Sequence, residues 1–334
     1  MRKFLFSFGF LFCVFASPVA GQNVSLFDRA SSPLYNRIKD FKLKWPLKAI
    51  LIWNKKTGRF ICENPLTRRE SYNSVNIQKL VRTKKGNCAN LSSAQLMGVP
   101  LYHARLIGAT LESADLTNAN LAMSDLRNAS FVKATSLGGT LFNGANLKGA
   151  TLNSASFESP KMIKTDLDDS DMTGAILSDA DFSQALLIKA KLVSSVIEGA
   201  RFNGAAMDKA DLTGADAQKN PQTGEATDFS GAQMQNARFD GANLSGANFS
   251  ASILSQASFE HANLGEANFS DANLEGANLS AENLALAHFE RADLRGAKIT
   301  TPLTQATMTG AVYDSKTVLP FDDAKAHELG MIKK

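Results

Sequence analysis

Residues 242–269 read ANLSGANFSASILSQASFEHANLGEANF, in which a small, a polar and a large apolar residue recur every five positions. The large apolar residue is the centre of each repeat and is leucine or phenylalanine in Leu244, Phe249 and Leu264. The 42 centres lie at five-residue steps in residues 91–131, 142–212 and 229–299, and at 303, 308 and 313. A repeat that covers about two-thirds of the chain determines its fold.

A period of five matches neither an α-helix, at about 3.6 residues, nor a β-strand, at about 2. A square coil satisfies it if each side takes one repeat, with the small and large apolar residues inside. One coil then takes 20 residues, and that longer period is present in a series of phenylalanines: Phe229, Phe249, Phe269 and Phe289. The sequence therefore predicts that these four side chains stack in one core column.

Charged residues support the same coil, because residues 20 apart would be neighbours on coils about 4.8 Å apart. Opposite charges recur at that separation in Arg105 and Asp125, Lys148 and Asp168, Asp271 and Arg291, and Glu275 and Arg295. Like charges also occur, in Asp240 and Glu260 and in Lys189 and Lys209. Exposed ion pairs add little stability, so these pairs serve as evidence of register.

The Ala-(Asp/Asn)-(Leu/Phe)-x-x consensus over residues 89–313 resembles the pentapeptide-repeat family. The resemblance implies an all-β solenoid, a right-handed quadrilateral β-helix of about 11 coils and roughly 50 Å in length. The open ends of such a rod need covers. We expect a small α+β cap at the N-terminal end, with a helix near residues 75–82, and a short helical cap in residues 314–334.

Two interruptions break the repeat. One extra residue lies between Phe131 and Phe142, in residues 136–141. Two extra residues lie between Leu212 and Phe229, in the polar stretch 217–227. This stretch predicts a loop at one corner of the rod. Insertions in solenoids are often binding features, and a surface loop without a partner is the alternative.

The start of the chain carries export features. Arg2 and Lys3 precede an apolar run, residues 4–16, that is too short to span a membrane and is followed by small residues. We expect residues 1–21 to be a cleaved signal peptide and the mature protein to be periplasmic or secreted. A buried N-terminal segment is the alternative.

Two cysteines, Cys62 and Cys88, remain after that cleavage. In an exported chain they predict one disulfide, with two buried free thiols as the alternative. Residues 79–91 resemble the entry sequence of the family, which usually has a second cysteine three residues before the position of Cys88. Lys85 stands there in this chain, so a disulfide would have to reach Cys62.

Residues 22–88 form a predicted basic head, with 15 Lys/Arg against 4 Asp/Glu, whereas residues 89–313 carry 15 against 24. Residues 49–62 predict a hairpin. A candidate surface for anionic lipid, envelope polymer or nucleic acid comprises Lys39, Lys42, Lys44, Lys48, Lys55, Lys56 and Arg59. Docking on the acidic rod of the same or a second copy and a solvated cap are the alternatives. Nucleic acid is the least favoured partner for an exported chain.

The sequence predicts no catalytic, cofactor or metal site. Clustered carboxylates suit hard cations, but Asp166, Asp168, Asp169 and Asp171 lack the glycine and final glutamate of a calcium loop. Three of them also have a lysine one coil away. The four histidines share neither a side nor a stack of the coil: His103, His261, His288 and His327. A core filled by Leu and Phe leaves no cavity for a small-molecule substrate.

These features favour a non-catalytic exported scaffold that presents the faces of its rod to an unknown protein or envelope polymer. An envelope-associated module, anchored by the basic head, is the second hypothesis. The resemblance brings a third, because some pentapeptide-repeat proteins mimic DNA and bind type II topoisomerases. That role requires a cytosolic location and a strongly acidic rod. Peripheral membrane contact and a dimer both stay open.

Overall fold

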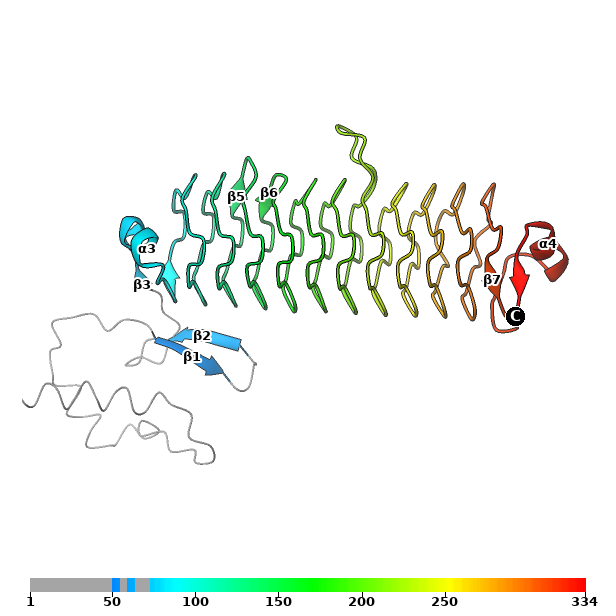
Figure 1. Ribbon diagram of the computed structural model, residues 1–334, viewed down its shortest axis with the longest axis horizontal. Coiled ribbons are helices and arrows are strands. Elements are labelled where there is room, and N and C mark those ends of the chain that lie inside the picture. Colours follow the sequence, from blue (N-terminus) through cyan, green and yellow to red (C-terminus); the bar gives the residue numbers. More distant parts are fainter. Residues whose placement is uncertain (1–49, 55–58, 64–72) are drawn as a thin grey trace, which may run out of the picture. The chain divides into compact units, whose positions relative to one another are not determined.

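The computed structural model describes residues 50–54, 59–63 and 73–334 (Figure 1). The chain divides into two compact units, Met1–Pro46 and Leu47–Lys334. The first unit, which includes the predicted signal peptide, lies wholly outside the described residues. All described residues belong to the second unit.

The second unit is dominated by a rod of stacked coils (Figure 1). Each coil meets the next through parallel bridges of one residue each, and the first four are Lys85↔Arg105, Asn90↔Thr110, Gln95↔Asp115 and Pro100↔Asn120. Bridges therefore follow one another every five residues along the chain and join residues 20 apart across coils. On one side of the rod, eleven successive bridges lead from Asn90 to Val318. The predicted four-sided coil of 20 residues is thus the one observed.

A corner in every repeat produces this square path. In a representative repeat, Ala247 N–H donates to the Leu244 carbonyl at 3.0 Å, which closes a turn. Gly246 lies within that turn at φ +69°, the positive φ that a type II turn requires at its third residue. Leu244 N–H and Gly246 N–H both donate at 2.8 Å to the following coil, to the carbonyls of Asn263 and Gly265. Coil-to-coil hydrogen bonds therefore satisfy the backbone on either side of the corner.

The core is built from columns of stacked apolar side chains. The predicted phenylalanine column is present, and its rings stack at centroid distances of 4.7–5.1 Å and interplanar angles of 5–10°. Its members are Phe182, Phe202, Phe229, Phe249, Phe269 and Phe289. A second column, Phe239 and Phe259, meets the first edge-to-face. All these rings are fully buried.

Both predicted interruptions lie in the rod, but the second is longer than expected. Asn120 bridges Leu141, a separation of 21 residues, so the first interruption holds one extra residue. Arg201 bridges Asp228, a separation of 27, so the second holds seven extra residues and not two. With only two extra residues, residues 218–222 would form one more side of the coil, with Gln222 as its core residue. In the structure Gln222 is exposed. In Figure 1 this insertion projects from the rod as a yellow-green loop.

The N-terminal end of the described chain contains a hairpin and a helix. Strands β1 (Ile50–Asn54) and β2 (Arg59–Glu63) pair antiparallel, with Leu51 opposite Cys62. Strand β3 (Asn73–Ser74) pairs parallel with β4 (Ala89–Asn90) of the first coil. This pairing brings the segment before the helix onto the end of the rod.

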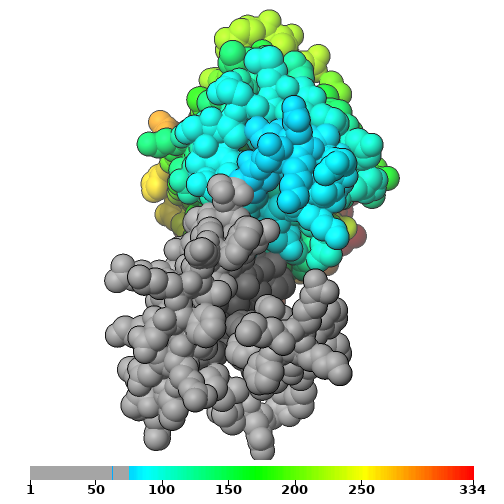
Figure 2. All heavy atoms as spheres, turned by 90° about the vertical axis from the view of Figure 1, so that its left-hand side faces the viewer, coloured from blue at the N-terminus to red at the C-terminus, as the bar shows by residue number. Residues whose placement is uncertain are grey.

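Helix α3 (Ile77–Thr83) covers the first coil. Its N-cap, Asn76, accepts a hydrogen bond from Lys79 N–H at 2.9 Å. Leu80 is buried and belongs to the same core cluster as the coil side chains. Gly86 permits this contact, because a Cβ there would lie 2.7 Å from Leu80 Cδ1. Figure 2 looks at this end of the rod and shows the residues around α3 in blue and cyan.

The other end of the rod also gains a strand and a helix. Strand β8 (Ile332–Lys333) pairs parallel with β7 (Val312–Tyr313). Between them lies helix α4 (Asp323–Glu328), whose N-cap Asp322 accepts from Lys325 N–H at 2.9 Å. Ala326 and Met331 are buried against the core. One further two-residue pair, β5 (Thr135–Ser136) and β6 (Ser156–Phe157), lies at the first interruption.

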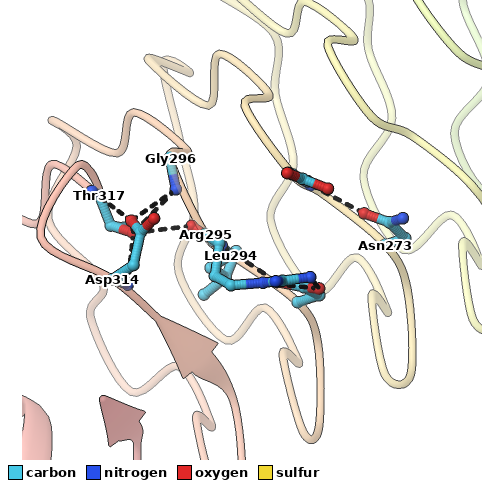
Figure 3. Close-up of polar contacts among 8 residues, drawn as sticks. Asn273, Leu294, Arg295, Gly296, Asp314 and Thr317 are labelled. Atoms are coloured by element: carbon cyan, nitrogen blue, oxygen red, sulfur yellow. Dashed lines mark hydrogen bonds and ion pairs between the residues drawn. The ribbon is translucent and has the colours of Figure 1, made fainter. Parts of the chain in front are cut away.

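A polar cluster fastens the turn after β7 to the preceding coil (Figure 3). The Asp314 carboxylate accepts from Gly296 N–H at 2.9 Å, and from Thr317 N–H at 3.0 Å. The Thr317 hydroxyl lies 2.8 Å from the same carboxylate and 3.1 Å from the Leu294 carbonyl oxygen. These donors, first the Gly296 N–H and then the Thr317 hydroxyl, lower the pKa of Asp314.

This cluster makes the stability of the C-terminal end depend on pH. A carboxyl whose pKa is lowered by folding stabilises the fold fully above its unfolded pKa, about 3.9, and ceases to do so as pH falls through the folded pKa. We expect Asp314→Asn to melt below the wild type at pH 7 and the two melting temperatures to converge in acid. Thermal unfolding from pH 7 to about pH 2 measures this. A difference that stays constant over that range would contradict the assignment.

Candidate binding surfaces

The four ladders of bridges define four faces of the rod. On each face the outward side chains are those of the bridge residue and of the two turn residues after the buried centre. One face, which we call the acidic face, carries the ladder Gln95, Asp115, Thr135, Ser156, Ile176, Val196, Asp216, Asn243, Asn263 and Asn283. Both interruptions belong to this face, since each follows one of its bridge residues, Thr135 and Asp216.

Negative charge is concentrated on the acidic face. It carries seven carboxylates, namely Asp115, Glu158, Asp179, Glu198, Asp216, Glu225 and Glu266, and a single basic residue, Lys219. Residues 89–313 have nine more acidic than basic residues, so this one face accounts for six of the nine. The other three faces are close to balanced.

Oppositely charged residues pair on the other faces. Lys148 Nζ lies 3.5 Å from Asp168 Oδ2, as the 20-residue spacing predicts. Arg291 donates two hydrogen bonds to Asp271, at 2.6 and 2.5 Å, and they lower the pKa of that carboxyl. The Arg291–Asp271 pair is exposed and therefore contributes little to stability, whereas Asp168 of the other pair is half-buried.

The other two predicted pairs find different partners. Arg127 donates to Asp125 at 2.8 and 2.7 Å, and Arg295 donates to Asp293 at 2.9 and 2.5 Å. Figure 3 shows Arg295 beside the Asp314 cluster. Among the described residues no ion pair joins Arg105 to Asp125, although their backbones form a bridge. Spacing thus predicts which backbones are adjacent better than it predicts which side chains pair.

The four clustered aspartates do not converge on one point. Lys148 lies 3.5 Å from Asp168 and 3.9 Å from Asp169. Burial raises the pKa of Asp166. Asp171 bridges Thr151 on a neighbouring face and accepts from Asn153 Nδ2 at 2.9 Å. Within the described ranges, no three or more His, Cys, Asp or Glu residues are placed to hold a metal ion.

The carboxylates of the acidic face lack basic partners. Throughout the part of the chain that the structure describes, none of the seven forms an ion pair with lysine or arginine. Three accept instead from neutral amides: Asp179 from Asn220 at 3.0 Å, Glu198 from Gln218 at 3.0 Å and Asp216 from Asn243 at 3.1 Å. Their negative charge is therefore oriented by these bonds without being neutralised.

The seven-residue insertion is fixed at its base and exposed at its tip. Asn220 is buried, and its side-chain oxygen accepts from the N–H groups of Gln222 and Thr223 at 2.8 and 3.2 Å. The Asn220 Cβ packs over Gly199, where an added Cβ would lie 3.1 Å away. Residues 221–225 are exposed. Figure 2, viewed along the rod, shows the yellow-green loop projecting beyond the outline of the coils.

Apolar side chains are also exposed on the acidic face. Leu137, in the first interruption, is 83% exposed, which makes it the most exposed large apolar residue described. Ile176 is 47% exposed and bridges the half-buried Val196 on the next coil. Leu137 and Ile176 lie two coils apart. The face therefore combines free negative charge with accessible apolar surface.

Six of the seven residues of the predicted basic surface lie outside the described residues: Lys39, Lys42, Lys44, Lys48, Lys55 and Lys56. Arg59 is in β2, and its side chain is likewise outside the description.

Cys62 and Cys88 are joined by a disulfide with Cα atoms 5.6 Å apart, and both are buried. No helix in the described ranges has the length and apolar character needed to cross a membrane.

The sequence matches the family model for pentapeptide repeats, in eight copies, at residues 89–131, 133–174, 175–214, 227–265, 242–280 and 262–301. The chain belongs to the pentapeptide-repeat family. The family model does not match residues 215–226, which include the loop of the second interruption. No curated protein sequence matches this chain significantly.

Two solved structures are similar to this chain to different degrees. HetL of the cyanobacterium Nostoc sp. strain PCC 7120, described as involved in regulating heterocyst differentiation, is 26% identical with a TM-score of 0.53, over 74% of this chain and 100% of HetL. QnrB1, a plasmid-mediated fluoroquinolone resistance protein, is 18% identical with a TM-score of 0.33, over 67% of this chain and 93% of QnrB1. The likeness to HetL identifies the rod as a right-handed β-helix.

Proposed function

We propose that this protein is a non-catalytic, exported scaffold that binds macromolecular partners along the faces of its pentapeptide-repeat rod. One observation carries the proposal: a single buried cluster of Leu, Phe, Met and Ala runs through the rod from Leu91 to Ile299. Because these side chains fill the interior, other molecules can contact the rod through the outward side chains of its faces. Regular solenoid faces of this kind are typical binding surfaces.

The export half of the proposal rests on residues 1–21, with their positive start and short apolar run. The disulfide between Cys62 and Cys88 is consistent with an oxidising compartment. No catalytic group is assigned: the described histidines and carboxylates lie on the outside of the rod, whereas buried serines such as Ser170 and Ser195 lie inside it. The proposed partner is a protein or an envelope polymer.

Site-specific photocrosslinking in the source cells tests this proposal. A photoreactive amino acid is placed at Ile176, on the acidic face, or at Ile253, on another face; both side chains are exposed. Fractionation and mass spectrometry of the tagged protein then locate the mature N-terminus and the crosslinked partner. A chain cleaved near residue 21 with a discrete partner at either position supports the proposal. An uncleaved cytosolic chain, or folded exported protein without a crosslink at either position, contradicts it.

A second candidate function is attachment to the cell envelope through the basic head. The motivating observation is the net charge of +11 in residues 22–88. Attachment of this kind depends on ionic strength, because salt screens charges at about 10 Å in 0.1 M solution. Membrane sedimentation that is released by salt and abolished by reversing Lys42, Lys44 and Lys48 supports it. DNA mimicry would need negative charge over more of the rod, whereas one face carries six of its nine excess negative charges.

A further inference from the structure

Three apolar side chains lie in the middle of the acidic face, and we call them the apolar strip. Leu137 is 83% exposed and Ile176 is 47% exposed, with the coil of Ser156 between them, and Val196 lies beside Ile176 on the next coil. These residues occupy outward positions that the repeat fills with polar residues in most coils, as in Asn243 and Asn263 of the same ladder. Exposed apolar side chains at neighbouring positions of an otherwise polar, regular surface indicate a contact site for another molecule.

The charges around this strip define what such a molecule must carry. Glu158, Asp179, Glu198 and Asp216 lie on four successive coils, about 4.8 Å apart along the rod. None of them forms an ion pair among the described residues, and three are held by neutral amide donors. Neighbouring carboxylates repel one another. On the other faces lysine and arginine side chains reduce that repulsion, whereas on the acidic face a cationic partner would reduce it.

The base of the loop contributes to the same strip. Asn220 and Gln218, which flank the exposed Lys219, donate to Asp179 and Glu198 respectively, so the insertion fixes two of the four carboxylates. Asn220 reaches back across two coils to do so. The loop therefore orients Asp179 and Glu198, which lie on the coils of Ile176 and Val196. Its residues 221–225 are exposed.

We propose that the acidic face between Leu137 and Asp216 docks a cationic, extended segment of a protein partner that mixes basic with apolar side chains. Side chains on one side of an extended strand recur about every 6.8 Å, so a segment of ten residues covers the strip. The inference rests on the proposed scaffold function and adds the site and the chemistry of the partner. A metal ion is not the occupant, since the carboxylates are distributed over four coils.

Two labelled decapeptides serve as probes for fluorescence anisotropy with the mature chain. The first is Lys-Lys-Val-Val-Lys-Lys-Val-Val-Lys-Lys, and the second has serine in place of every valine at equal charge. We expect the valine peptide to bind at least fivefold more tightly than the serine peptide. Valine favours an extended backbone and supplies the apolar contacts that Leu137 and Ile176 lack.

Matched triple variants locate the site. Glu158→Gln, Asp179→Asn and Glu198→Gln together remove three charges from the acidic face and keep the oxygen acceptors for the loop. Glu112→Gln, Glu260→Gln and Glu275→Gln remove three exposed carboxylates from other faces. We expect the first triple to weaken binding of the valine peptide at least tenfold and the second less than twofold. Equal melting temperatures of the two triples show that both remain folded.

Three outcomes overturn the inference: no binding by the wild type, equal losses in the two triples, or equal affinity for the valine and serine peptides. Equal losses mean attraction to net charge alone, and equal affinities mean that the apolar strip takes no part. If photocrosslinking captures a partner from another face while the triples behave alike, the scaffold function stands and this docking site fails. If crosslinking captures nothing, the scaffold function itself fails.

Discussion

Replacing Phe249 by alanine is expected to lower the free energy of unfolding by about 4 kcal/mol. The Phe249 ring is fully buried and lies 4.9 Å from the rings of both Phe229 and Phe269. It also meets Phe239 and Phe259 edge-on, at 5.6 and 5.7 Å. Truncation removes all four ring contacts at once. The coils on either side cannot collapse into the space, because their backbone hydrogen bonds fix the spacing.

Denaturant unfolding of Phe249→Ala and Phe249→Leu measures this effect. Leucine fills the equivalent position in other columns, such as Leu244 and Leu264, so we expect Phe249→Leu to lose less than half as much stability. Because each coil contacts only its neighbours, the alanine variant should also unfold less cooperatively than the wild type. A loss below about 1 kcal/mol in the alanine variant would mean that the ring stack does not hold the rod together.

The solenoid could be predicted from sequence because its physics is local and periodic. A small inward residue, a large inward residue and a corner recur every five positions, and each coil therefore packs on the next through the same kinds of contact. Phe229 and Phe249 therefore stack as their 20-residue spacing predicts. Spacing fails where the chain leaves the rod: Phe202 and Phe229 are 27 residues apart and still stack, at 4.9 Å.

The phase of the repeat does not determine the length of the second interruption. Two and seven extra residues leave the centres of the next repeats in the same phase, since they differ by one whole repeat. Deciding between them depends on whether residues 218–222 form a side of the coil. In the structure Asn220 instead lies over Gly199 and donates to Asp179, and Pro221 begins the exposed tip. No local pattern in the sequence encodes that choice.

The acidic face is encoded in the sequence, but the net charge of the rod does not show it. Net charge over residues 89–313 shows an acidic body and does not show how the charge is distributed among faces. Sorting outward residues by their phase in the 20-residue period would have placed Glu158, Asp179 and Glu198 together. The choice of ion-pair partners could not be obtained in this way, because Arg295 pairs with Asp293 in its own coil, an outcome of side-chain geometry.

Removing the disulfide is expected to release the hairpin β1–β2 while the rod stays folded. A two-stranded hairpin alone is at best marginally stable in water. The link between Cys62 and Cys88 closes a loop with a separation of 26 residues, which stabilises the closed arrangement by about 3.5 kcal/mol. The effect should stay local, since coils far from the first one have no contact with it.

Hydrogen exchange of the double variant Cys62→Ala, Cys88→Ala and of the reduced wild type measures this release. Amides of residues 50–54 and 59–63 should exchange a few hundredfold faster than in the oxidised protein, which corresponds to about 3.5 kcal/mol. Amides around Phe249 and Phe269 serve as the internal control and should not change. Unchanged exchange in the hairpin with both thiols free would show that other contacts hold it. Faster exchange throughout the rod would instead mean that the first coil nucleates all the others.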